Sequence, residues 1–73
     1  MSYPVINLVE SGKIIKEMMK IRGISVRDLK EYLGFNNTNS IYKWLRGDSL
    51  PNLENMYALS ELLGVSVNDL LVQ

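Results

Sequence analysis

The 73-residue chain contains no cysteine and no histidine. Disulfides are therefore excluded, and so are the zinc sites that these two residue types usually build. A chain this short buries only roughly 60% of the surface that its unfolded form exposes. Stability must come from close helix packing or from a partner subunit, and we expect a homodimer.

Long hydrophobic runs are also absent. No apolar segment approaches the roughly 20 residues of a membrane span, and the start MSYPVINLVES lacks the charged and then apolar pattern of a signal peptide. We expect a soluble, cytoplasmic protein associated with the nucleoid, without a membrane partner.

Groups suited to catalysis are few. The carboxylates and serines show no spacing that pairs a base with a nucleophile, and no glycine-rich loop follows a strand to hold phosphate. We therefore expect no enzymatic activity, no cofactor and no metal site.

Positive charge is missing from the last third of the chain. Residues 1–46 carry all eight cations and four acids, a net charge of +4, whereas residues 47–73 carry four acids and no cation, a net charge of −4. The total is zero, which by itself does not favour nucleic-acid binding. The asymmetry favours a molecule with one side that faces an anion, although chance clustering on solvated faces would look the same.

Glycines and serines mark the ends of the expected helices. Gly23, Gly34, Gly47 and Gly64 each follow helical apolar spacing, and a glycine in the left-handed conformation ends a helix at little steric cost. GISVRDL and GVSVNDL each place a serine three residues before an aspartate, as in a capping box. This pattern predicts an all-α fold with helices over residues 11–21, 25–33, 37–46, 52–63 and 66–71. Residues 1–10 are expected to form an N-terminal arm, and residues 11–73 the domain.

Apolar residues recur at steps of three and four, so each helix has one face for a common core. These positions are Ile15, Met18, Met19, Leu29, Leu33, Ile41, Trp44, Leu45, Leu53, Met56, Leu59 and Leu63, with Phe35, Leu50, Val65 and Leu70 at the joints. We assign Trp44 to the core rather than to a stacking surface because it shares helical spacing with Ile41 and Leu45.

The short connection GFNN joins residues 25–33 to residues 37–46 and predicts that these two helices cross steeply, as in a helix-turn-helix. ISVRDLKEYLG and SIYKWLRGDSLPNLENMYALSELLGVSVNDLL resemble the Cro/CI-type (XRE, lambda-repressor-like) helix-turn-helix family over residues 12–71. The resemblance implies a compact five-helix domain whose third helix lies in the DNA major groove. The start of the second helix would approach the DNA backbone.

The outer face of residues 37–46 has suitable chemistry for reading bases. On a wheel of roughly 100° per residue, Asn39, Lys43 and Arg46 lie opposite Ile41, and Asn37 is expected to cap the helix. Asparagine suits adenine, lysine reaches guanine acceptors, and no carboxylate repels phosphate. An ordinary solvated face is the alternative. The predicted base contacts are Thr38, Asn39, Ser40, Tyr42 and Lys43.

Phosphate contacts are expected at the start of the second helix, where free N–H groups and the helix dipole attract anions. The predicted residues are Ser25, Arg27, Lys30 and Arg46. Alternatively, Arg27 and Lys30 only pair with Glu31 or other nearby acids. For Lys13, Lys16 and Lys20 we favour a solvated face.

Three features depart from the family pattern. Ile41 follows Gly34 by seven positions rather than six, which makes the turn before the third helix one residue longer. Val26 stands where many members carry a glutamine that braces the third helix and touches DNA. Asp48 follows Gly47 in a loop that is often basic in the family.

Two functions follow. The first is a sequence-specific regulator of transcription, repressor-like, that binds double-stranded DNA as a homodimer. The second is a protein-interaction module of the same fold, antitoxin-like or an anti-regulator, with weak or no DNA binding. The chain ends soon after the last expected helix, so we expect no small-molecule ligand. Leu70, Leu71 and Val72, with the N-terminal arm, are the candidate dimer surface.

Overall fold

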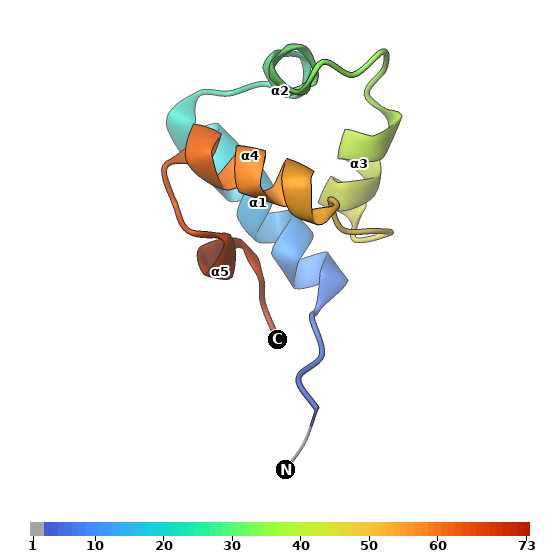
Figure 1. The fold of residues 1–73 in the computed structure, drawn as a ribbon, viewed down its shortest axis with the longest axis vertical. Helices are drawn as coiled ribbons and strands as arrows, with labels where there is room; N and C mark the ends of the chain where they lie inside the picture. The colour runs from blue at the N-terminus through green and yellow to red at the C-terminus, as the bar shows by residue number, and fades with distance from the viewer. Residues whose placement is uncertain (1–2) are drawn as a thin grey trace.

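The computed structural model describes residues 3–73, and this range contains five helices and no strand (Figure 1). The helices are α1 (Leu8–Arg22), α2 (Val26–Leu33), α3 (Asn39–Arg46), α4 (Leu53–Leu63) and α5 (Val67–Leu70). The all-α, five-helix prediction is confirmed. No helix in the described range is long and apolar enough to cross a membrane.

The capping boxes form as predicted. At the start of α2, the Asp28 N–H donates to Ser25 Oγ at 3.0 Å and the Ser25 N–H donates to Asp28 Oδ2 at 2.9 Å. Ser66 and Asp69 make the same pair of bonds at the start of α5. The glycines that end α1 to α4 all have positive φ, between 69° and 82°. Short-range sequence patterns therefore set most of the helix ends.

Two helix starts differ from the prediction. Helix α1 begins at Leu8 rather than near residue 11, because Asn7 is an effective cap whose Oδ1 accepts from the Glu10 N–H at 3.0 Å. Helix α3 begins at Asn39 rather than Asn37, and Thr38 holds the cap position without a side-chain hydrogen bond. Asn37 Oδ1 instead accepts from the Asn39 N–H at 2.9 Å. The extra residue of the connection thus lies in the turn. Residues 1 and 2 of the expected arm lie outside the described residues.

The core is built from nearly all of the expected apolar positions. The buried apolar side chains are Ile15, Met19, Leu29, Ile41, Trp44, Met56, Leu59, Leu63 and Leu70. Trp44 is a core residue as predicted, and its ring meets Phe35 edge to face with centroids 5.8 Å apart.

Leu53 was wrongly assigned to the core, since its side chain is 81% exposed. It is the first residue of α4, and helical side chains lean toward the N-terminus, so the Leu53 side chain extends past the start of the helix. The spacing of three residues between Leu53 and Met56 therefore did not indicate that Leu53 is buried.

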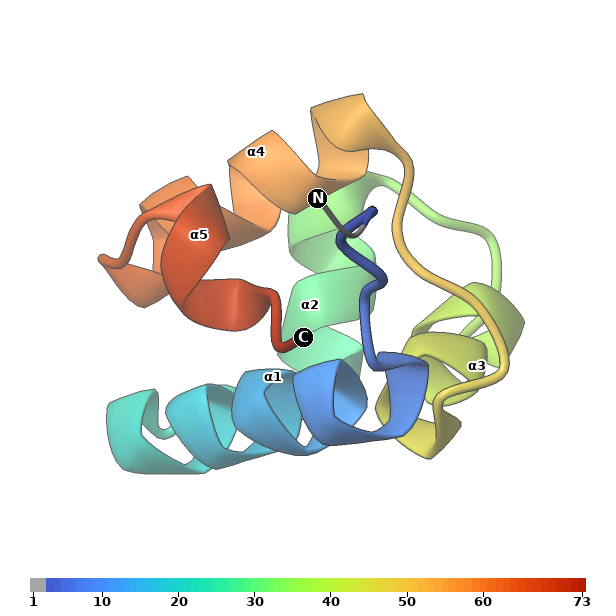
Figure 2. The ribbon, with the colours of Figure 1, turned by 90° about the horizontal axis from the view of Figure 1, so that it is seen from below.

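The helices α2 and α3 cross steeply, since Figure 1 views α2 almost end-on and α3 from the side. In Figure 2 helix α1 lies along one side of the molecule, α4 and α5 lie along the other, and α3 lies at one end. Helix α2 lies at the end of the molecule away from the N-terminus (Figure 1). Gly12 allows α1 to approach α3 closely, because a Cβ atom there would lie 2.4 Å from the Trp44 carbonyl oxygen.

The segment around Asn7 meets the C-terminal segment beside α1. The Asn7 N–H donates to the Val72 carbonyl, and the Val72 N–H donates to Oγ of the buried Ser11 at 2.9 Å. Beyond this contact the arm extends away from the helices (Figure 1), with Tyr3 and Val5 exposed.

Candidate nucleic-acid interface

The exposed face of α3 contains the predicted base-contact residues. Asn39, Ser40, Tyr42 and Lys43 are exposed, and Thr38 is half-buried at the helix start. Ile41 and Trp44 anchor the opposite face in the core. Helix α3 contains no acidic residue. Its outer face therefore offers amide, hydroxyl, phenol and ammonium groups to a ligand.

Two of the predicted base-contact residues, Ser40 and Tyr42, lie on opposite edges of α3. Ser40 lies at a hollow of about 280 Å³ formed with the turn residues Gly34 to Asn37. Tyr42 lies on the other edge, which faces α1 and the start of α2. The longer turn thus adds surface beside Ser40.

The two arginines among the predicted phosphate-contact residues pair with acids. Arg46 Nε and Nη2 both lie 3.0 Å from Asp48 Oδ2. Arg27 Nε lies 3.7 Å from Glu31 Oε1, so the pairing foreseen as an alternative is present. Both pairs are well exposed, and exposed ion pairs contribute at most about 1 kcal/mol, so a phosphate could replace either acid.

Ser25 is exposed, but both its hydroxyl and its N–H are engaged with Asp28. The hydrogen bond from the Ser25 backbone N–H, then that with the Ser25 side chain, lowers the pKa of Asp28 below its ordinary value of 3.8. A carboxylate thus occupies the start of α2, where an anion site was expected. Lys30 is half-buried, further along the helix.

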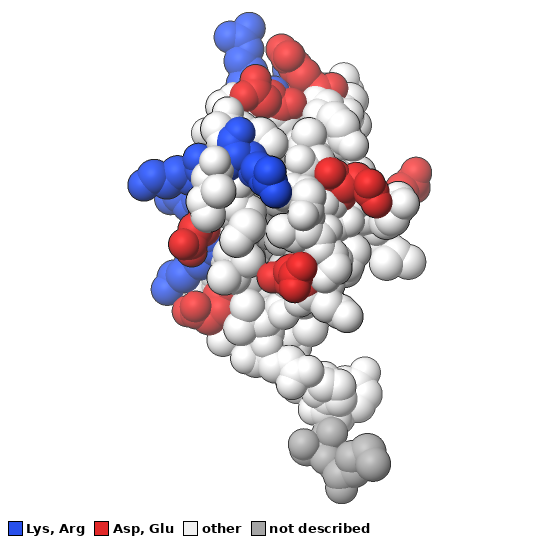
Figure 3. All heavy atoms as spheres, turned by 90° about the vertical axis from the view of Figure 1, so that its left-hand side faces the viewer, with Lys and Arg blue, Asp and Glu red and all other residues white. Residues whose placement is uncertain are grey.

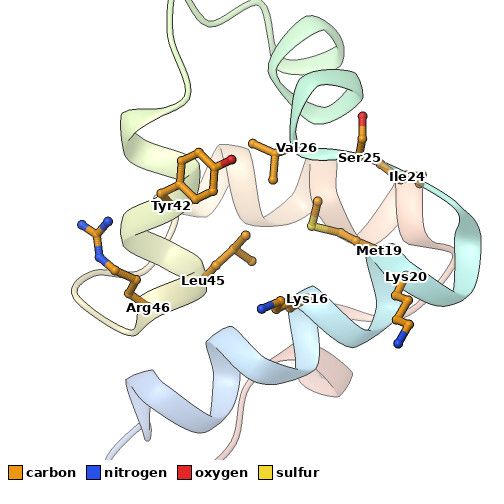
Figure 4. Close-up of a pocket in the computed structure, with 9 residues that line it drawn as sticks. All are labelled: Lys16, Met19, Lys20, Ile24, Ser25, Val26, Tyr42, Leu45 and Arg46. Carbon is orange, nitrogen blue, oxygen red and sulfur yellow. The ribbon is translucent and has the colours of Figure 1, made fainter.

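A pocket of about 430 Å³ brings residues of three helices together (Figure 4). Ser25 from the start of α2 and Tyr42 and Arg46 from α3 line it, together with Lys16 and Lys20 of α1. The sequence placed these two lysines on a solvated face and did not relate them to α3. The only signal was Gly12, because a glycine inside a helix can mark the close approach of another backbone.

The cations are unevenly distributed over the surface. In Figure 3 the Lys and Arg side chains gather toward one half of the visible face, whereas Asp and Glu occur on both halves. All of the cations precede Gly47, and the acids of α4 and α5 are Glu54, Glu61 and Asp69. The charge asymmetry of the sequence therefore persists in the fold.

A steep α2–α3 pair with a polar outer face on α3 agrees with the family comparison. The Helix-turn-helix family model matches residues 15–70. The chain belongs to this helix-turn-helix family. The resemblance to Cro/CI-type (XRE) proteins is thereby confirmed, and membership supports a DNA-binding regulator of transcription.

Two solved structures share the fold of this helix-turn-helix protein. The restriction-modification controller protein C.AhdI from Aeromonas hydrophila matches with a TM-score of 0.75 and 24% identity, covering 86% of this chain and 94% of that one. The DNA-binding domain of BldD matches with a TM-score of 0.73 and 19% identity, covering 90% and 94%. No curated protein sequence matches the chain.

Proposed function

We propose that this helix-turn-helix protein is a sequence-specific, repressor-like regulator of transcription that binds double-stranded DNA with α3 in the major groove. The observation that carries the proposal is the exposed face of α3, which is polar, contains two cations and lacks a carboxylate. Phosphate would not be repelled from such a face, and its side chains match the donors and acceptors of base edges.

In this proposal the residues of α3 have separate roles. Asn39, in the first turn, pairs with adenine, and Lys43, one turn further on, donates to guanine acceptors. Thr38, Ser40 and Tyr42 supply the remaining base contacts. Ser25, Arg27, Lys30 and Arg46 contact phosphates and set the register, with DNA displacing Asp48 from Arg46 and Glu31 from Arg27.

The test begins with the preferred site, selected from random duplexes and then titrated at several salt concentrations. A linear fall of log K with log salt is expected, with a slope that reflects a few released counterions. The Lys43→Ala variant is expected to lose about 1–3 kcal/mol of binding free energy at the preferred site and to relax its preference at one base pair.

Lys13→Ala is the matched control, because it removes the same charge from α1 and Lys13 is no predicted contact. Equal losses in both variants would reduce the role of Lys43 to general electrostatics. Failure to select any duplex at low salt would overturn the DNA-binding proposal.

The second candidate is a protein-interaction module, antitoxin-like or an anti-regulator, with weak DNA binding. The carboxylates of Asp28 and Asp48 favour it, since both lie beside groups expected to meet phosphate. The double variant Asn39→Ala, Lys43→Ala distinguishes the two functions. The interaction module would be supported if regulation survives in this double variant. Regulation should then be lost only in variants that cannot bind a protein partner through another surface.

We also propose a homodimer that uses the joined ends of the chain. Leu70 is fully buried and cannot contribute, but Leu71 and Val72 are half-buried and Tyr3 and Val5 are exposed. Sedimentation equilibrium of the whole chain is expected to show a dimer that Val5→Glu dissociates. Ile21→Glu is the control at the far end of α1, and a strict monomer at high concentration would contradict the proposal.

A further inference from the structure

The walls of the pocket between α1, α2 and α3 are mainly apolar. Met19 is buried in its floor, and Ile24, Val26 and Leu45 are half-buried around it. In Figure 4 the side chains of Met19, Val26 and Leu45 converge on the space between the helices, with the ring of Tyr42 beside them. Its volume of about 430 Å³ falls within the roughly 300–1,000 Å³ of small-molecule sites.

The charged residues at the pocket are all cations. Lys16 extends its ammonium group toward the gap between α1 and α3, whereas Lys20 and Arg46 point away from the centre (Figure 4). None of the described residues that line the pocket carries a carboxylate. An anionic group beside Lys16 would gain a charge-assisted hydrogen bond, and the apolar walls would receive an apolar body.

We propose that this pocket binds a small organic anion with an apolar body, such as an aromatic carboxylate or sulfonate, with the anionic group beside Lys16. A DNA backbone segment is a poorer fit, because a hydrated sugar-phosphate would gain little from aliphatic walls. The proposal departs from the expectation, drawn from the sequence, that the protein has no small-molecule ligand. It does not depend on the proposed function.

The test uses two probes with the same body. The probe 1-anilinonaphthalene-8-sulfonate carries an anionic group, and N-phenyl-1-naphthylamine lacks it. We expect one sulfonate per chain, with amide chemical-shift changes centred on Lys16, Val26 and Tyr42. The neutral probe is expected to bind on the order of tenfold more weakly, since it gains nothing from Lys16.

Two variants test the two parts of the pocket. Lys16→Met is expected to weaken sulfonate binding on the order of tenfold and to leave neutral-probe binding unchanged. Lys13→Met is the matched control and should change neither. Val26→Gln places an amide in the apolar wall and is expected to weaken both probes.

Four results would overturn the proposal. The first three are no binding of the sulfonate at millimolar concentration, shift changes located elsewhere on the molecule, and equal loss in the Lys16 and Lys13 variants. A fourth is shift changes at the pocket with duplex DNA but with neither probe, which would assign the pocket to the DNA backbone.

A coupling between anion binding in the pocket and DNA binding rests on the proposed function. Ser25, Tyr42 and Arg46 line the pocket and are also predicted DNA contacts, so the sulfonate should compete with duplex binding. Band-shift titrations with and without the probe measure this. If the protein binds no DNA, probe binding still tests the pocket, so the two failures are distinguishable.

Discussion

At the scale of single residues, Gly12 shows how one missing side chain sets a helix contact. A Cβ atom at this position would lie 2.4 Å from the Trp44 carbonyl oxygen and 2.9 Å from that of Leu45. In an open helix, replacing glycine by alanine stabilises by up to about 1 kcal/mol. Here the contact is with backbone atoms that cannot rotate away, so the clash outweighs the gain in helix propensity.

Gly12→Ala is therefore expected to lower the free energy of unfolding by about 1–3 kcal/mol, the usual cost of overpacking. Urea denaturation followed by Trp44 fluorescence measures it. Lys13 lies on the solvent side of the same turn, so the free energy of unfolding of Lys13→Ala should stay within about 0.5 kcal/mol of that of the parent protein. A stabilised Gly12→Ala protein would contradict the close contact of α1 with α3.

The capping aspartates predict how stability depends on pH. Hydrogen bonds from the backbone N–H groups of Ser25 and Ser66 lower the pKa values of Asp28 and Asp69 below 3.8. A carboxyl group whose pKa is lower in the folded state stabilises the fold above its unfolded pKa, and this contribution is lost as pH falls through the folded pKa. The loss should therefore occur below about pH 3.8.

Carboxyl chemical shifts titrated from pH 7 to 2 should place both folded-state pKa values under 3.8. As pH falls below about 3.8, the urea midpoint of the Asp28→Asn, Asp69→Asn double variant should fall less than the midpoint of the parent protein. Glu54→Gln is the control, since Glu54 belongs to no capping box. Parallel acid profiles in all three proteins would refute the prediction.

At the scale of elements, α3 begins two residues later than the sequence predicted. The prediction placed Asn37 at the helix start, as its cap. In the structure the Thr38 backbone (φ −99°, ψ 4°) departs from the extended conformation usual at a cap, and its side chain bonds no helix N–H. The Asn39 N–H donates instead to Oδ1 of Asn37, one residue before the cap position.

Asn37→Ala is accordingly expected to cost about 0.5–1 kcal/mol of stability, because it removes the acceptor for the first N–H of α3. Thr38→Ala should change stability by less than about 0.5 kcal/mol. Thermal unfolding of both variants, with amide exchange at Asn39, provides the measurement. A larger loss in Thr38→Ala would show that the threonine is the true cap.

At the scale of the whole molecule, a buried serine joins the first turns of α1 to the C-terminal segment. Ser11 Oγ accepts from the Val72 N–H, 61 residues away in sequence. Ser60 is also buried, but its hydroxyl donates to the Tyr57 carbonyl within the same helix. The two serines have similar burial and different partners, so they form a matched pair.

Ser11→Ala should cost about 1–3 kcal/mol, because it leaves the Val72 N–H without its acceptor. Amide exchange at Val72 and Asn7 should accelerate together. Ser60→Ala should cost less, since the carbonyl that it bonds is part of a helix. Equal costs, with no change in exchange at the chain ends, would argue against the joined ends.

The sequence by itself determined the number of helices, most of their ends, the core and the family, because these depend on short-range capping and on periodic burial. It also predicted which residues of α3 are exposed. Only the tertiary structure decided that Lys16 and Lys20 share a pocket with Tyr42 and that Ser11 holds Val72. These contacts join residues far apart in the chain, and their geometry follows from how closely α1 packs on α3 and where the chain ends meet.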